Sequence, residues 1–67
     1  MTITLEAARK NRRMTQEQAA KKIGVTRDTL SNWERGKCFP NALHIKTIEK
    51  VYGVSYNDLV FLGKDYV

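Results

Sequence analysis

Residues 15–36 read T-Q-E-Q-A-A-K-K-I-G-V-T-R-D-T-L-S-N-W-E-R-G, and this stretch decides the fold of the chain. Thr15 begins a capping box, in which the cap residue and the third helical residue each accept a hydrogen bond from a backbone amide. Gly24 has the backbone freedom to end that helix with a positive φ. Thr26 can cap a second helix almost immediately afterwards. The stretch therefore predicts two short helices joined by a sharp turn, within about residues 16–35.

The second of these helices has two chemically different sides. At 100° per residue, Leu30 and Trp33 lie together on one side. The opposite side carries only polar side chains, those of Arg27, Asp28, Ser31, Asn32 and Arg35. Two short helices at a sharp turn, the second with a polar outer side, are typical of the helix-turn-helix that places a recognition helix in the major groove of DNA.

Positive charge is concentrated in the half of the chain that holds this motif. The 67 residues include 12 Lys and Arg against 7 Asp and Glu, for a net charge of +5. Residues 1–37 hold nine of the cationic and four of the acidic side chains, whereas residues 38–67 hold three of each. Such asymmetry favours a polyanionic partner, although ribosome-binding and membrane-surface proteins share it. A chain of this length predicts one domain, spanning 1–67.

Several other classes of protein do not fit the composition. The single cysteine, Cys38, cannot form an internal disulfide, and with His44 alone it falls short of a tetrahedral zinc set, so we expect no metal and no cofactor. The N-terminal residues, with a charge at Glu6, form neither a signal peptide nor a membrane span, so we expect a cytoplasmic protein. We expect no enzyme, because the sequence has no nucleophile and base pair, carboxylate pair or glycine-rich phosphate loop.

The remaining caps and glycines predict three further helices. Thr4 caps a first helix, Asn41 caps a fourth and Ser55 starts a short fifth. Their expected ends are Arg13, Tyr52 and Gly63, respectively. The I-T-L start resembles a strand, but no alternation runs long enough to build a sheet. The expected fold class is therefore all-α, a compact bundle of five helices.

From Thr15 to Gly36 the chain resembles the Cro and lambda-repressor-like (Xre-type) helix-turn-helix family. Counted from Gln16, the family pattern has a small residue fifth, an aliphatic residue eighth, glycine ninth, and apolar residues tenth, fifteenth and eighteenth. This sequence supplies Ala20, Ile23, Gly24, Val25, Leu30 and Trp33 at those places. The likeness continues through W-E-R-G and Pro40 over nearly the whole chain. It implies a five-helix, lambda-repressor-like domain and the function of a sequence-specific transcriptional regulator.

The resemblance also implies a role for individual polar residues. Arg9 is expected to pair with Glu34 and tie the first helix to the recognition helix. Four side chains are expected to contact base edges, namely Arg27, Asp28, Ser31 and Asn32. Five are expected to contact DNA phosphates, namely Gln16, Thr26, Arg35, Lys37 and Asn41. The alternative for Asp28 is that its carboxylate only stabilises the N-terminus of its own helix.

One recognition helix reads only a short half-site, so the family likeness implies a homodimer on a pseudo-palindromic operator in double-stranded DNA. Residues 59–62 are four consecutive apolar residues, which cover more than one helical face. Together with the C-terminus they give the candidate dimer contacts, Val60, Phe61, Tyr66 and Val67. The alternative is that these side chains only pack the C-terminus.

The regulatory class depends on the length of the protein. If the chain is full length, it is similar to a small repressor of the phage or mobile-element type; a fragment of a longer protein is the other possibility. A second functional class is a protein-interaction module, such as an antitoxin or a coactivator-like helix-turn-helix protein whose DNA binding is secondary. Dependence on a protein partner distinguishes that class.

Overall fold

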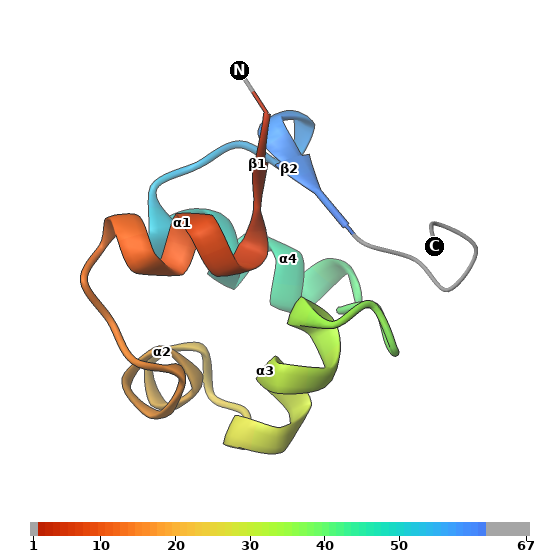
Figure 1. Ribbon diagram of the computed structural model, residues 1–67. Helices are drawn as coiled ribbons and strands as arrows, with labels where there is room; N and C mark the ends of the chain where they lie inside the picture. The colour runs from red at the N-terminus through yellow and green to blue at the C-terminus, as the bar shows by residue number, and fades with distance from the viewer. Residues whose placement is uncertain (1, 62–67) are drawn as a thin grey trace.

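The computed structural model describes residues 2–61, which form four α-helices beside a very small sheet (Figure 1). The helices are α1 (Leu5–Asn11), α2 (Gln16–Ile23), α3 (Arg27–Glu34) and α4 (Ala42–Tyr52). The other elements are the strands β1 (Ile3–Thr4) and β2 (Leu59–Val60) and the 3-10 turn η1 (Tyr56–Asp58). The all-α class and the first four expected helices are therefore correct. The end of α1 differs, because Arg13 leaves the helical region with φ 57°.

The expected fifth helix, and with it the five-helix count, is wrong. Only η1 is helical there, and the chain then runs as β2, whose Leu59 pairs in parallel with Ile3 of β1. An extended chain points alternate side chains to the same side, so both Leu59 and Phe61 reach the core. A sheet of two residues per strand escaped prediction because its two strands come from opposite ends of the described chain. The expected end at Gly63 lies outside the described residues.

The start of α2 and the turn after it have the predicted local geometry. The Thr15 hydroxyl accepts a hydrogen bond from the Gln18 amide at 3.1 Å, and Gln18 Oε1 accepts one from the Thr15 amide at 2.9 Å. At the other end, Gly24 has φ 93° and its amide donates to Ala20. An added Cβ on Gly24 would meet no atom within 4 Å, so glycine is needed here for its backbone conformation and not for space.

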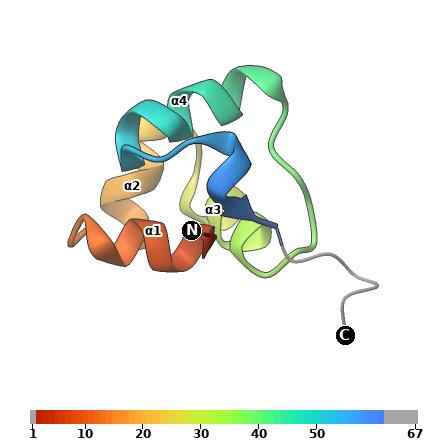
Figure 2. The same cartoon turned by 90° about the horizontal axis from the view of Figure 1, so that it is seen from above.

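The core lies where α1, α2, α3 and α4 face one another. Its buried apolar residues are Leu5, Ala8, Ala19, Ala20, Ile23, Leu30, Trp33, Ile48, Tyr52 and Leu59. Three of them are alanines on α1 and α2, which allow neighbouring helices to approach closely. The long connection from α3 to α4 runs on the side of the molecule away from α1 (Figure 2). The polar side of α3 is thereby left outside the core.

The C-terminal end of α4 is fixed by a side chain from the end of α1. Arg12 Nε donates a hydrogen bond of 3.0 Å to the carbonyl of Tyr52, one of the carbonyls that a helix end leaves without a partner. Gly53 follows in the left-handed region with φ 69°, and an added Cβ there would run into the Arg12 guanidinium. Arg12 is thus a structural cation that links α1 to α4.

Tyr52 itself gives a prediction about stability at high pH. Its hydroxyl is buried without a hydrogen-bond partner among the described residues, and burial raises the Tyr52 pKa to about 12. An unfolded tyrosine ionises near 10, so the folded state holds its proton longer and stability falls as the pH rises from about 10 to about 12. Between pH 10 and pH 12 the free energy of unfolding of Tyr52→Phe should therefore fall by about 2 kcal/mol less than that of the parent.

At neutral pH the same Tyr52→Phe variant should be as stable as the parent or more stable by about 1 kcal/mol, because an unpaired buried hydroxyl costs free energy. Urea denaturation at pH 7, 10 and 12 measures both effects. Tyr56→Phe is the matched control, since Tyr56 is half exposed. A Tyr52→Phe variant clearly less stable at pH 7 would mean that the hydroxyl has a stabilising partner.

Candidate nucleic-acid interface

Helix α3 presents the four expected base-contacting side chains away from the core. Arg27 and Asp28 are exposed, whereas Ser31 and Asn32 are half-buried. Leu30 of the same helix is completely buried. Within residues 2–61, Arg27, Asp28 and Ser31 have no side-chain hydrogen bond or ion pair. Their polar atoms are therefore available to a partner along one side of an eight-residue helix.

Asn32 differs from the other three, because it is already hydrogen-bonded. Arg35 Nη2 donates to Asn32 Oδ1 at 3.2 Å on the exposed side of α3. A carboxamide that reads adenine must use both its oxygen and its amide nitrogen. Asn32 keeps a second lone pair on Oδ1 and a free amide nitrogen, so both groups remain available while Arg35 holds this bond, and Arg35 keeps further donors for an anion.

The expected phosphate contacts are spread over the ends of three helices. Two of them cap helices: the Thr26 hydroxyl accepts from the Thr29 amide at 3.2 Å, and Asn41 Oδ1 accepts from the His44 amide at 2.9 Å. Asn41 retains its amide NH₂ as a donor, whereas the Thr26 hydroxyl also shares a hydrogen bond of 2.9 Å with the Thr29 hydroxyl. Lys37 is exposed, with no side-chain partner among the described residues. These groups are compatible with phosphate binding, but only Lys37 is fully uncommitted.

Gln16, also expected to bind phosphate, is oriented by a side chain of α3. Its Nε2 donates a hydrogen bond of 3.0 Å to Oε1 of Glu34. A carboxamide nitrogen carries two hydrogens, so one donor remains free while the other is held by the carboxylate. The N-terminal position on α2 suggested only a phosphate contact, and no local signal in the sequence indicates the bond to Glu34.

Arg9 and Glu34 form a buried ion pair with two parallel hydrogen bonds. Arg9 Nε lies 2.8 Å from Glu34 Oε2, and Nη2 lies 3.2 Å from Oε1. Arg9 Nη1 donates a third bond, of 2.9 Å, to the carbonyl of Met14. The hydrogen bond to Glu34 raises the Arg9 pKa. Both residues are less than a tenth exposed, and their hydrogen bonds hold α1, α3 and the start of α2 together.

The expected dimer contacts are placed differently from the sequence interpretation. Val60 lies in β2 beside Thr4, and Phe61 packs against the core, so both are half-buried. Tyr66 and Val67 lie outside the described residues. Sequence reasoning missed the large apolar side chains that are in fact exposed, namely Phe39 (62%), Leu43 (75%) and Tyr56 (51%). One signal was available in the sequence: Leu43 is an apolar residue on the outer side of the otherwise amphipathic α4.

Phe39 and Tyr56 each lie with their ring centroid 6.0 Å from that of Phe61, so they form one aromatic cluster. We call Phe39, Tyr56 and Phe61 the apolar cluster; Leu43 is a separate exposed apolar side chain on α4. It joins the α3–α4 connection to η1 and the end of β2. An exposed apolar surface of this kind is typical of a contact site for another macromolecule.

Residues 2–61 contain neither a cluster of metal-ligating side chains nor a helix that could span a membrane. That part of the chain contains no group of three or more His, Cys, Asp or Glu side chains that could hold a metal ion. Its helices are all too short and too polar to cross a bilayer.

A short helix, a glycine turn and a second helix with a polar outer side define the helix-turn-helix class of domain. The sequence profile of the helix-turn-helix family matches residues 5–59. The chain therefore belongs to this Xre/Cro-like helix-turn-helix family.

Curated relatives of the chain are named as transcriptional regulators. It is 38% identical over 56 residues to the HTH-type transcriptional activator BcrR of Enterococcus faecalis, covering 84% of this chain and 28% of that protein. It is 40% identical over 52 residues to an uncharacterized HTH-type transcriptional regulator of Methanocaldococcus jannaschii, covering 78% and 77%. A further uncharacterized regulator, from Archaeoglobus fulgidus, is 41% identical over 46 residues, covering 69% and 66%. The chain thus spans under a third of BcrR.

The Arg9–Glu34 pair generates a prediction about folding. Glu34→Gln removes one charge and leaves Arg9 buried without its counter-ion, so the free energy of unfolding should fall by about 3 kcal/mol. Glu6→Gln is the matched control, because Glu6 pairs with Lys10 at 3.0 Å but on the exposed surface, where such a pair is worth under about 1 kcal/mol. Urea denaturation at pH 7 measures both variants. If Glu34→Gln and Glu6→Gln had the same free energy of unfolding, the buried pair would not stabilise the fold.

Proposed function

We propose that this chain is a sequence-specific DNA-binding transcriptional regulator that inserts α3 into the major groove. The observation that carries the proposal is the outer side of α3, where Arg27, Asp28 and Ser31 have no partner in residues 2–61. Family membership and the regulator names of the relatives support it. The concentration of the net charge in residues 1–37 supports it further, because positive charge near this helix favours a polyanion.

The proposed base contacts follow from the donor and acceptor pattern of each side chain. Arg27 binds guanine O6 and N7 with two donors, and Asp28 accepts from cytosine N4. Asn32 binds adenine through its oxygen and nitrogen, and Ser31 contacts either kind of base edge. Arg35 orients the Asn32 carboxamide through its existing bond and uses its remaining donors for a phosphate.

Phosphate contacts from five residues fix the position of α3 in the groove. Gln16 uses the donor that Glu34 leaves free, at the N-terminus of α2, where the helix dipole also favours an anion. Lys37 supplies a full charge from the start of the α3–α4 connection. The remaining contacts come from Thr26, Arg35 and Asn41.

The regulator binds as a homodimer to a pseudo-palindromic operator, with half-sites about 10 base pairs apart or a multiple of that spacing. The apolar cluster supports a second copy of this chain as the occupant. Phe39 lies in the same connection as Lys37, next to the proposed phosphate contacts. Val60, Phe61, Tyr66 and Val67 remain the other proposed contacts, and Phe61 belongs to both sets.

As to its class, we infer a repressor of the phage or mobile-element type, because occupying an operator is enough to block transcription. The apolar cluster also favours the alternative, a protein-interaction module such as an antitoxin or a coactivator-like protein with secondary DNA binding. A binding measurement with the purified protein and DNA alone distinguishes the two classes. The repressor binds its operator without a further protein, whereas the interaction module needs its protein partner.

The proposal is tested by selecting duplexes from a random pool and then measuring variants on the selected site. Arg27→Ala should weaken binding to that site by about 1 to 3 kcal/mol and binding to random DNA much less. Lys37→Gln is the matched phosphate variant. It should weaken binding to both duplexes alike and lower the salt slope by about one unit. A pool that yields no preferred site would contradict sequence-specific binding.

The dimer contact gives a separate prediction. Replacing both Phe39 and Tyr56 by Ser should raise the dissociation constant of the dimer at least about tenfold, because fully burying one such side chain contributes about 1.5 to 3 kcal/mol. Both side chains are exposed, so the monomer should still fold. Val60→Thr tests the other proposed contact, on β2. Sedimentation equilibrium measures all three proteins, and a loss confined to Val60→Thr would move the dimer contact from the apolar cluster to β2.

A further inference from the structure

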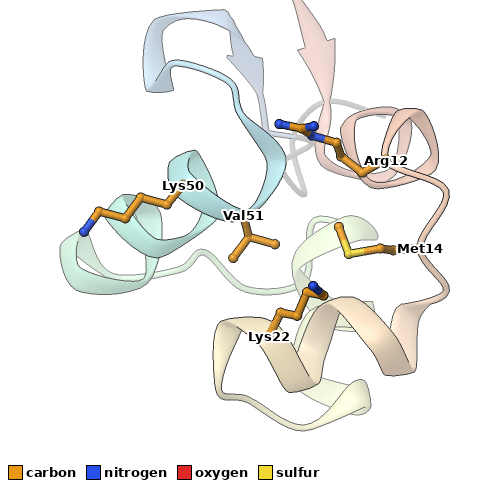
Figure 3. Close-up of a pocket in the computed structure, with 5 residues that line it drawn as sticks. All are labelled: Arg12, Met14, Lys22, Lys50 and Val51. Atoms are coloured by element: carbon orange, nitrogen blue, oxygen red, sulfur yellow. The ribbon is translucent and has the colours of Figure 1, made fainter.

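A second surface with the properties of a binding site lies where the C-terminal ends of α1, α2 and α4 meet. An open hollow of about 560 Å³ there is lined by Arg12, Met14, Lys22, Lys50 and Val51 (Figure 3). None of these residues belongs to α3. The hollow is therefore distinct from the side of the recognition helix that carries the proposed base contacts.

The hollow joins cationic side chains to an apolar floor. Met14 and Val51 are half-buried and pack against the core, so their positions are fixed by the fold. Figure 3 shows Lys22 and Arg12 on opposite sides of these two side chains, whereas the side chain of Lys50 extends from α4 away from them. Within residues 2–61, none of the three cations has an acidic partner.

The helix ends do not cancel this charge. The C-terminus of a helix carries roughly half a negative charge, so three helix ends offset about one and a half of the three positive charges. Glu49, the carboxylate next to Lys50 in the chain, is directed elsewhere, because it accepts a hydrogen bond from the amide of Tyr56 at 2.7 Å. The hollow keeps an excess of positive charge beside an apolar surface.

We propose that this hollow binds a small molecule that carries a phosphate or carboxylate group on an apolar body. Lys22 and the free guanidinium nitrogens of Arg12 hold the anion, Lys50 adds positive charge at the edge of the hollow, and Met14 and Val51 contact the apolar part. Arg12 is pre-positioned for this, because its Nε is already bound to the carbonyl of Tyr52. Since α3 takes no part, the molecule and DNA bind at the same time.

The proposal is tested by titrating the isotope-labelled protein with phenyl phosphate and, separately, with inorganic phosphate. The methyl resonances of Met14 and Val51 report occupancy directly by NMR. Both probes should shift them, and phenyl phosphate should saturate the shift at a concentration at least about fivefold lower, because its ring buries apolar surface. Absence of any shift, or equal affinity for the two probes, would overturn the proposal.

Matched lysine variants separate a defined site from general positive charge. Lys22→Gln and Lys50→Gln should each weaken phenyl phosphate binding at least about threefold, as expected for loss of one partly exposed charge contact. Lys21→Gln makes the same change one residue away on α2 and should leave binding unaltered. All three side chains are exposed, so the melting temperatures should stay close to that of the parent. Equal weakening by Lys21→Gln would contradict a defined site.

A third arm distinguishes a small molecule from the nucleic-acid backbone as the source of the phosphate. Adding a short duplex should leave the Met14 and Val51 methyl groups unshifted, and Lys22→Gln should bind the duplex as Lys21→Gln does. Duplex-induced shifts at these methyl groups, together with a larger loss for Lys22→Gln, would make the hollow part of the DNA interface and overturn the proposal. DNA binding through α3 is tested independently, by the α3 variant Arg27→Ala on the selected duplex.

Discussion

The carboxylate of Glu34 is the group on which the arrangement of the helices depends. It accepts hydrogen bonds from Arg9 Nε, Arg9 Nη2 and Gln16 Nε2, and so connects the end of α3 to α1 and to the first residue of α2. A buried charge is tolerated only when it is paired and hydrogen-bonded, so each of these donors has a defined place. The guanidinium of Arg9 extends the constraint to Met14, just before the second helix.

This constraint matters because the surrounding core is small. Ala8, Ala19 and Ala20 allow the helices to come close, but alanine buries little apolar area and contributes little to the free energy of folding. Many mutual positions of such helices would have similar packing energies. A bidentate ion pair has one good geometry, so it selects a single position for α3 relative to α1. The orientation of the proposed recognition helix thus follows from a bond on its buried side.

The sequence predicted those parts of the fold that local chemistry determines. The limits of α2 and α3 follow from Thr15, Gly24 and Thr26, each of which acts on its own neighbours. The strand at Leu59 was missed because its partner lies at the other end of the chain. Likewise, Gln16 was given only a phosphate role, since the helix start is visible in the sequence and its acceptor on another helix is not. Among the candidate site residues, positions on α3 were predictable from periodicity, whereas existing bonds such as Arg35 to Asn32 were not.

Six of the nine cationic side chains in residues 1–37 fall into three groups by position. Arg9 and Arg12 are bound to groups inside the protein and hold helices together. Arg27, Arg35 and Lys37 lie on or just after α3, where the proposed DNA contacts are. Lys22 faces a different surface, beside an apolar floor that a phosphate backbone does not need. A single polyanionic partner would account for the second group alone, and the separate position of Lys22 is what points to a second, smaller anion.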